Sequence, residues 1–190
     1  MAGKDVRSRM VSAGEDLLAE RGYGVTMLDV IERADAPRGS IYYHFPDGKN
    51  ELAVEVARKV TREVEMFVAM TAEKIEDPVA FLQRLLDHHR KRLTTSDYDL
   101  GCPMMGIVVT GDGSAELDEA VSTAFRVWTS VIAKALRGKG FTKAQAEQLA
   151  SLLVTGIEGC IVVSRGRRST QPFAEFSRTL PLLVQAVSSA

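Results

Sequence analysis

The chain has 190 residues, of which 45% are hydrophobic and 26% are charged, and its formal net charge is −1. Such a composition excludes a disordered chain and a large multidomain assembly, and it favours one domain or a small domain joined to a larger one. The unbroken apolar runs fall far short of the roughly 18 residues that cross a bilayer, and no apolar stretch follows the basic amino terminus, so we expect no membrane span, no secretory signal and a cytoplasmic protein.

Turn-forming residues divide the chain into about nine segments, and the longer segments have the spacing of amphipathic helices. Apolar residues recur every three or four positions, whereas the two-residue alternation of a strand is nowhere sustained. Two short β-like runs, at 106–110 and 161–163, are flanked by helical pattern and are assigned to buried helices. The sequence therefore predicts an all-α protein, with helices over residues 5–21, 26–34, 37–44, 49–76, 79–93, 102–109, 114–137, 142–165 and 173–187.

The first three predicted helices have the lengths and the turn of a helix-turn-helix unit. Thr26 stands as the N-cap of the second helix with Asp29 three residues on, and Val25 and Val30 occupy the two positions of a hydrophobic staple. The tight turn 35–37 ends this helix, since its proline is tolerated only in the first turn of the next one. A supporting helix followed by two short helices is the arrangement that places its last helix in the major groove of DNA.

The third helix needs only Ile41 and Phe45, one turn apart, to anchor it to a small core. Its other side chains then face outward, and they combine a guanidinium that can bond guanine, a glycine that permits close approach, a hydroxyl donor and aromatic rings with polar tips. These residues are Arg38, Gly39, Ser40, Tyr42, Tyr43 and His44. The alternative is that the tyrosines and the histidine pack against the following helix.

Charge in the first 49 residues is balanced, with seven Lys and Arg against eight Asp and Glu. We nevertheless expect basic residues at the amino terminus and on the third and fourth helices to converge on phosphates. These are Lys4, Arg7, Arg9, Arg38 and Lys49. Each monomer should then have a small footprint on DNA and depend on dimer symmetry for affinity.

Three stretches of these residues resemble the signature of TetR-family transcriptional regulators, over about 48 residues. The stretches are 25–30, 38–45 and the Lys-Asn-Glu-Leu run at 49–52. The chain departs from the signature at 35–37, where Asp-Ala-Pro replaces the common Gly-Val-Ser, and at Gly48, which is an added residue. This addition and the Gly-Cys-Pro-Met run at 101–104 resemble the branch that includes the lincomycin-resistance repressor.

The resemblance implies a homodimer whose two recognition helices enter successive major grooves of a near-palindromic operator, and a repressor that an apolar or amphipathic effector releases, without a cofactor or a metal. It implies a DNA-binding domain, 1–48, and a helical effector-binding and dimerisation domain, 49–190, with the long helix 49–76 as a lever. Phosphate contacts fall on Thr26, Tyr43, His44 and Lys49, and contacts near the bases on Arg38, Gly39, Ser40 and Tyr42.

Methionines and aromatic side chains after residue 60 give an adaptable apolar lining of the kind that drug-binding cavities have. The candidates are Phe67, Met70, Phe81, Tyr98, Met104, Met105, Phe125 and Trp128. Core packing is the alternative at each position. The adjacent His88 and His89 are expected at the surface or in a polar part of the core, and the basic residues Arg165, Arg167 and Arg168 in a solvated turn.

The last two helices carry apolar faces, and Gly156 and Gly159 suggest close approach of a partner helix, since glycine in a helix costs about 1 kcal/mol relative to alanine. We expect a four-helix dimer interface there. Its expected residues are Leu153, Gly156, Ile157, Cys160, Phe176, Leu180, Leu183 and Val184. The alternative is that they form the core of one monomer.

Two other functions fit parts of the sequence. A cysteine-dependent enzyme would use Cys102 with His88 or His89, but no acid with motif spacing orients a base, and no glycine loop cradles phosphate. Cys102 and Cys160 are expected as reduced thiols, and histidines and cysteines are too few for a zinc site. A constitutive DNA-binding protein would have no drug-sized cavity, and no small molecule would change its operator affinity.

Overall fold

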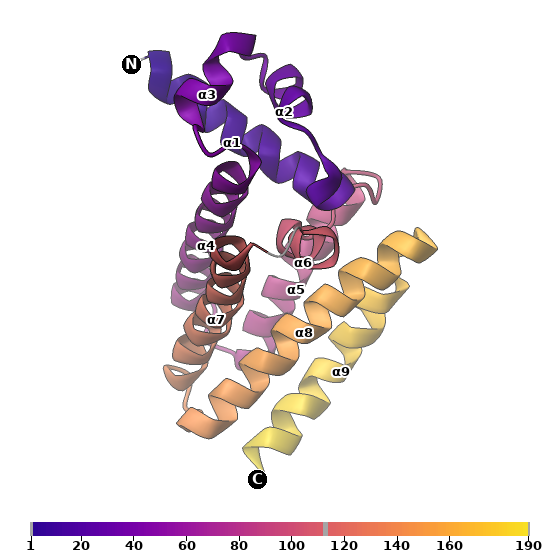
Figure 1. The fold of residues 1–190 in the computed structure, drawn as a ribbon. Helices are drawn as coiled ribbons and strands as arrows, with labels where there is room; N and C mark the ends of the chain where they lie inside the picture. Colours follow the sequence, from indigo (N-terminus) through magenta and orange to yellow (C-terminus); the bar gives the residue numbers. More distant parts are fainter. Residues whose placement is uncertain (1, 112–113, 190) are drawn as a thin grey trace. The chain divides into compact units, whose positions relative to one another are not determined.

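The computed structural model describes residues 2–111 and 114–189, with side chains for residues 6–111 and 114–189. In that part of the chain it contains nine α-helices, two short 3-10 helices and no strand (Figure 1). The elements are α1 (Ala2–Arg21), η1 (Gly22–Gly24), α2 (Met27–Ala34), η2 (Arg38–Ser40), α3 (Ile41–His44), α4 (Lys49–Lys74), α5 (Pro78–Thr95), α6 (Pro103–Thr110), α7 (Ala115–Arg137), α8 (Lys143–Arg167) and α9 (Gln171–Ser188). The predicted all-α fold is confirmed, and both β-like runs lie in helices.

The helix ends follow from local sequence signals, and most lie within a few residues of the predicted ones. Thr26, Asp77 and Thr142 cap α2, α5 and α8, each accepting a bond from the backbone N–H three residues on. The segment 37–44 differs, because it is not one α-helix. Pro37 is extended, with ψ of 134°, and both the backbone N–H and the hydroxyl of Ser40 donate to its carbonyl oxygen. These three-residue bonds replace the first α-helical turn by η2.

The chain divides into two compact units. The first comprises Met1–Thr61 and Gly101–Ala124, and the second comprises Arg62–Leu100 and Phe125–Ala190. The sequence analysis expects a division between residues 48 and 49, with all later helices in one bundle. In the structure the first half of α4, the whole of α6 and the first part of α7 lie in the first unit instead.

Close packing between α1 and α6 explains why α6 belongs to the first unit. A side chain at Gly106 would collide with the carbonyl oxygen of Leu18, so only glycine lets the two helices approach this closely. The N–H of Gly101 also donates to the carbonyl of Ala19 at 2.9 Å. Large buried side chains of this unit are Met10, Leu17, Leu18, Phe45 and Leu52.

In the second unit α8 and α9 lie side by side, and both pack against α5 (Figure 1). The ring of Phe176 on α9 fills the space that a side chain at Gly156 would occupy. Leu153, Ile157 and Leu180 are buried in this unit. The close approach that Gly156 indicates is therefore made by a helix of the same chain.

Among the described residues, α8 is the one helix long and apolar enough to cross a membrane by length and composition. Within the protein, 44% of its apolar 18-residue window is buried. A core helix of a helical bundle has the same composition, and the packing of α8 on α5 and α9 accounts for its apolar residues.

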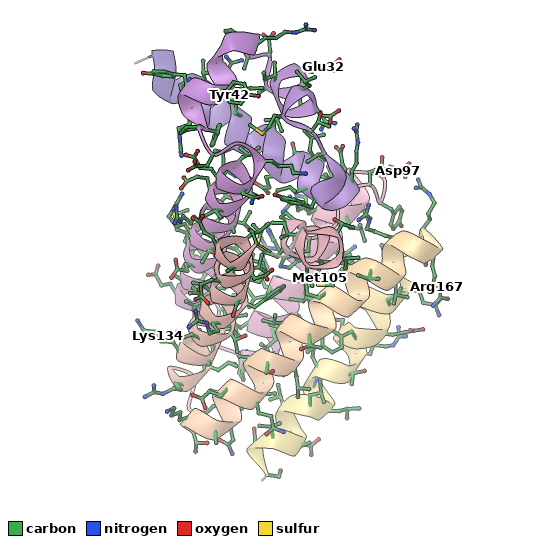
Figure 2. The ribbon with its side chains drawn as sticks, in the orientation of Figure 1. Glu32, Tyr42, Asp97, Met105, Lys134 and Arg167 are labelled. Atoms are coloured by element: carbon green, nitrogen blue, oxygen red, sulfur yellow. The ribbon has the colours of Figure 1, made fainter. Side chains whose placement is uncertain are left out.

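The turn after α5 has an unusual backbone conformation. Asp97 and Tyr98 have φ of 51° and 67°, in the left-handed region that residues other than glycine seldom adopt. Arg168 Nη2 donates to Asp97 Oδ2 at 2.6 Å, and Arg165 Nε donates to the Tyr98 carbonyl at 3.3 Å. Two of the three arginines expected in a solvated turn thus contact this turn, and Arg167, labelled in Figure 2, donates to Gln171.

Replacing Gly106 by alanine should lower the free energy of unfolding by about 1–3 kcal/mol, because the added methyl group forces α6 away from α1. Urea denaturation followed by circular dichroism measures this difference. Gly24→Ala is the matched control in the same unit, since a side chain there would meet nothing within 4 Å, and it should change stability by less than about 0.5 kcal/mol. Equal stability of the two variants would contradict the α1–α6 packing.

Candidate nucleic-acid interface

Bonds between Thr26 and Asp29 fix the start of α2. The Thr26 hydroxyl accepts from the Asp29 N–H at 3.2 Å, and the Thr26 N–H donates to Asp29 Oδ2 at 2.7 Å. The hydrogen bonds from Thr26 lower the pKa of the Asp29 carboxyl, and Arg21 at 3.5 Å acts in the same direction. Val25 and Val30 are buried, as a hydrophobic staple requires. The predicted amino-terminal signature of this helix is confirmed.

The turn between α2 and the next helix is closed by backbone bonds and by Arg9 of α1. Asp35 adopts φ of 47°, and the N–H groups of Asp35 and Ala36 donate to carbonyls in the last turn of α2. Arg9 Nη1 donates to the carbonyls of Ala34 at 2.6 Å and of Asp35 at 3.0 Å. A cation at these carbonyls also opposes the negative end of the helix dipole. The turn therefore holds without the glycine common in the signature.

The recognition segment, residues 38–45, has a buried inner side and an exposed outer side. Ile41 and Phe45 are 6% and 0% exposed, as predicted. Tyr42, labelled in Figure 2, is 77% exposed and Tyr43 is 80% exposed. His44 is half-buried, with its ring edge-on to Tyr43 at 4.8 Å between centroids. The alternative that the tyrosines pack against the following helix is wrong, because both rings face solvent.

Arg38, Gly39 and Ser40 differ in the hydrogen-bonding groups and the space that they offer to a ligand. Arg38 is exposed and has no hydrogen bond or ion pair among the described residues. A side chain at Gly39 would meet nothing within 4 Å, so the fold does not require glycine there. The Ser40 hydroxyl donates to Pro37 O at 2.6 Å, so the expected free donor is already used and its oxygen remains as an acceptor.

Most cations expected to converge on phosphate have partners inside the first unit. Arg7 lies 3.2 Å from Glu55 and 3.9 Å from Glu51. Lys49 Nζ donates to the Tyr23 carbonyl at 2.8 Å and lies 3.9 Å from the centre of its ring. Arg9 is bonded to the turn after α2. Of the five expected cations, Arg38 is the one whose side chain has no partner among the described residues, and the side chain of Lys4 lies outside those residues. The sequence pattern does not show these intrachain partners, and the phosphate contacts stay a prediction.

Gly48, the residue added to the signature, turns the chain into α4. It has φ of 71°, which favours glycine. Its N–H donates to Phe45 O at 3.0 Å, and its carbonyl accepts from the Leu52 N–H at 3.2 Å. The addition thus joins the end of the recognition segment to the first turn of α4.

Leu28 is a candidate contact residue that the sequence analysis missed. It lies in the first turn of α2 and is 63% exposed, although its apolar side chain resembles that of a core residue. Its neighbours Val30 and Ile31 take the buried positions of this short helix. The signal was available, because a third apolar residue on a two-turn helix with a buried staple has to point elsewhere.

The eight residues expected to line an effector cavity are divided between the two units. Met104 and Met105 belong to the first unit and the other six to the second. Phe81 and Met104 are fully buried, Trp128 is 6% exposed, and Met70 is 52% exposed. Core packing therefore explains some of these positions, and Met70 faces solvent because it lies on the outer side of α4.

Aromatic contacts do join several of these residues within the second unit. Phe67 lies 4.2 Å from the His88 ring, and Phe125 meets Trp128 edge to face at 5.1 Å. The Trp128 indole N–H is buried and has no hydrogen-bond partner among the residues that the structure describes. Burial, reinforced by His88 and Arg92, lowers the pKa of His89 to about 3, so its imidazole is neutral at physiological pH.

The residues expected at a dimer interface mostly face the inside of the monomer. Leu153, Ile157, Cys160 and Leu180 are each at most 7% exposed, and Gly156 is covered by Phe176. Leu183 and Val184 are half-buried. This part of the prediction is corrected, because helical spacing identifies an apolar face without showing which side of a helix faces outward. The exposed apolar side chains of α8 and α9 are Leu152, Val162, Val163 and Leu182.

The cysteines lie in different surroundings. Cys160 donates to the Pro172 carbonyl at 3.5 Å, and burial, with Glu175, raises the pKa of its thiol to about 11. Cys102 is half-buried at the N-cap of α6, in the first unit, whereas His88 and His89 belong to the second. Within the described ranges, no group of three or more histidine, cysteine or acidic residues is arranged to hold a metal ion.

Two protein-family models match the chain. Residues 10–56 match "Bacterial regulatory proteins, tetR family", and residues 78–179 match "Transcriptional regulator LmrA/YxaF-like, C-terminal domain". The second match alone covers more than half of the 190 residues.

Curated relatives match over nearly the whole chain. The chain is 29% identical to the HTH-type transcriptional regulator LmrA of Bacillus subtilis, over 97% of this chain and 100% of that protein. It is 30% identical to an HTH-type transcriptional regulator of Mycobacterium tuberculosis, over 95% and 94% of the two chains. It is 25% identical to the HTH-type transcriptional repressor DhaR of a Mycobacterium species, over 93% and 90%.

Solved structures share the fold. A TetR transcriptional regulator from Legionella pneumophila has a TM-score of 0.80 at 17% identity, covering 92% of this chain and 94% of that one. A TetR transcriptional regulator from Chloroflexus aurantiacus has a TM-score of 0.77 at 21% identity, covering 97% and 96%.

Replacing Arg9 by methionine should lower the free energy of unfolding by about 1–3 kcal/mol, because two carbonyls at the end of α2 lose a charged donor. Arg38→Met removes the same charge from an exposed side chain without a partner, and it should change stability by less than about 0.5 kcal/mol. Chemical denaturation measures both. If both variants were as stable as the parent, Arg9 would not hold the turn.

Proposed function

The chain belongs to the TetR family of bacterial transcriptional regulators, and from this premise we propose that it is a homodimeric repressor, released from a near-palindromic operator by a small apolar or amphipathic effector. The observation that supports this most directly is the outer side of the recognition segment. Arg38, Gly39 and Tyr42 are exposed there, and among the described residues the side chains of Arg38 and Tyr42 have no hydrogen bond or ion pair. Side chains placed so are available to base edges in a major groove.

We assign direct base contact first to Arg38, whose guanidinium can bond O6 and N7 of guanine. Gly39 leaves room for close approach of the duplex, and Tyr42 and Ser40 complete the set that faces the bases. Leu28 extends the same surface with an apolar side chain suited to a thymine methyl group.

Phosphate contacts are assigned to Tyr43 and His44, and to Thr26 and Lys49, which also make hydrogen bonds within the first unit. Thr26 is exposed at the positive end of α2, where backbone N–H groups favour an anion. Lys49 keeps two N–H donors beyond its bond to Tyr23, so it can serve both the fold and a phosphate.

For the dimer, we propose that the outward faces of α8 and α9 form the interface between two copies. Leu152, Val162, Val163 and Leu182 are 40–65% exposed, an unusual exposure for large apolar side chains on adjacent helices. Gly159 lies on the same side of α8 with no neighbour within 4 Å, which leaves room for a partner helix. Two recognition segments related by a two-fold axis explain how a small basic footprint gains affinity.

For the effector, we propose the second unit, and with it the division into a DNA-binding and an effector-binding part. The supporting observation is the buried indole N–H of Trp128, which has no hydrogen-bond acceptor in the part of the chain that the structure describes. An apolar ligand with one hydrogen-bond acceptor would satisfy it. A constitutive DNA-binding protein is the alternative, and it predicts that no small molecule changes operator affinity.

We propose no catalytic role and a cytoplasmic location. The relatives are named transcriptional regulators, which act on DNA in the cell interior. A Cys102 thiol would need a base, and a His89 imidazole with a pKa near 3 is too weak a base for that purpose.

Replacing Arg38 by alanine should weaken binding to the preferred operator by about 1–3 kcal/mol and relax the choice of base at one position of each half-site. Selection of bound fragments from random DNA, at two salt concentrations, gives the half-site spacing and the number of phosphate contacts for the parent and the variant. Arg90→Ala on α5 is the control, since Arg90 is paired with Asp87 in the second unit. Unchanged base preference in Arg38→Ala would refute the assignment.

Replacing Val162 by glutamate should convert the dimer to a monomer, because a charge would be buried at the centre of the proposed interface. Sedimentation velocity measures the change, and operator affinity should fall at least about tenfold because only one recognition segment remains engaged. Val108→Glu, an exposed apolar position on α6, is the control and should leave the dimer intact. A dimeric Val162→Glu protein would place the interface elsewhere.

A further inference from the structure

The second half of α7 and the first turns of α8 line an open groove of about 630 Å³ within the second unit, here named the α7–α8 groove. It lies among residues that the DNA-contact and dimer assignments do not use. Figure 2 labels Lys134, which lines it. The volume is within the range of small-molecule sites.

The groove is lined by more positive than negative charge. Arg126, Lys134, Arg137 and Lys143 face it, against the single carboxylate of Glu147 among its lining residues. Lys134 and Arg137 are exposed and have no ion pair among the described residues. Lys143 and Glu147 are 3.8 Å apart with side chains 76% and 57% exposed, which makes a weak pair. A net positive charge therefore remains for an anion.

Helix stability does not explain all of these cations. Lys134 and Arg137 stand in the last turn of α7, where positive charge opposes the helix dipole favourably. Lys143 stands in the first turn of α8, where positive charge is unfavourable, and that turn contains no acidic residue. A bound anion would offset this unfavourable placement.

The neighbouring groove between α4 and α7 gives a contrast within the same unit. It measures about 490 Å³, and its charged lining residues are Glu65, Glu73 and Glu76 against Lys134 and Lys139. Its Lys139 donates to the carbonyls of Ala72 and Ile75, so this ammonium is used by the fold. Lys134 lines both grooves, but three carboxylates outnumber the two cations here, so an anion is favoured in the α7–α8 groove.

We propose that the α7–α8 groove binds an amphipathic anion, with its carboxylate or phosphate head at Lys134, Arg137 and Lys143. The apolar chain lies along the ring of Phe125, the methyl group of Ala133 and the methylene stems of the cations. The proposal concerns binding alone and does not depend on release from an operator. Failure of one therefore leaves the other standing.

Binding is measured on the free full-length protein through Trp128, the chain's one tryptophan, whose ring meets that of Phe125 at 5.1 Å. Titration with decanoate at low ionic strength and pH 7 should change the emission saturably, with a Kd below about 1 mM. Decyl phosphate should also bind, and the tighter of the two identifies the head group. Neutral decanol should bind at least about tenfold more weakly, because it lacks the charge that the groove attracts.

Charge reversal locates the site. Lys134→Glu and Arg137→Glu should each raise the Kd for decanoate at least about tenfold, with unchanged circular dichroism, since both side chains are exposed. Lys91→Glu is the matched control. It makes the same charge change on α5, where Lys91 lines a separate basic groove of about 500 Å³, and it should leave the Kd unchanged.

Three results would overturn the proposal: no saturable response to either anion, decanol binding as tightly as decanoate, or a Kd that Lys91→Glu raises and the two α7 variants do not. The last result would move the site to α5. Isothermal calorimetry on the same proteins checks that a change in emission reports binding.

Discussion

The burial of Ile41 and Phe45 is the constraint on which the DNA-contacting surface depends. α3 has four residues, far too few for a helix that is stable by itself in water. Its direction is therefore set by these two side chains in the core of the first unit and by the bonds of Arg9 to the turn before it. Because the anchoring does not use the exposed side chains of Arg38 and Tyr42, these two remain available to contact bases.

Few positive charges near the recognition segment are available to DNA. A chain with net charge −1 has no excess of cations to spread over a duplex, and most basic residues near the recognition segment are bonded within the first unit. Arg7 lies over the Phe45 ring at 4.9 Å, so even this cation supports the anchor. In the proposed dimer, affinity would then depend on a few contacts repeated by symmetry, and much less on a broad electrostatic attraction.

The helices and their ends were predictable from the sequence because the signals that set them are local. Thr26 with Asp29, and Thr142 with Gln145, are capping boxes whose partners lie three residues apart. The outward direction of Tyr42 was also predictable, since the buried positions of a short segment leave only one free side. What local signals omit is the identity of distant neighbours.

Three features of the structure have distant neighbours as their cause. Lys49 was expected at a phosphate, and the sequence pattern did not show that the carbonyl of a tyrosine 26 residues earlier also accepts a bond from it. Leu153 and Val162 have similar spacing on α8, and only the packing of α9 and α5 decides that the first is buried and the second exposed. The place of α6 depends on Gly106 meeting the backbone of α1, about 88 residues away in sequence, which no pattern in either segment reveals.

The division into units also limits how an effector can act on DNA binding. The chain passes between the units at three points, and two of them lie inside continuous helices, within α4 and within α7, while the third is the loop between α5 and α6. A ligand in the second unit changes operator affinity only by the difference in its affinity for two arrangements of the protein. Because α4 and α7 continue from one unit into the other, we expect substitutions in these helices that touch neither ligand nor DNA to alter the coupling between the proposed effector and the operator.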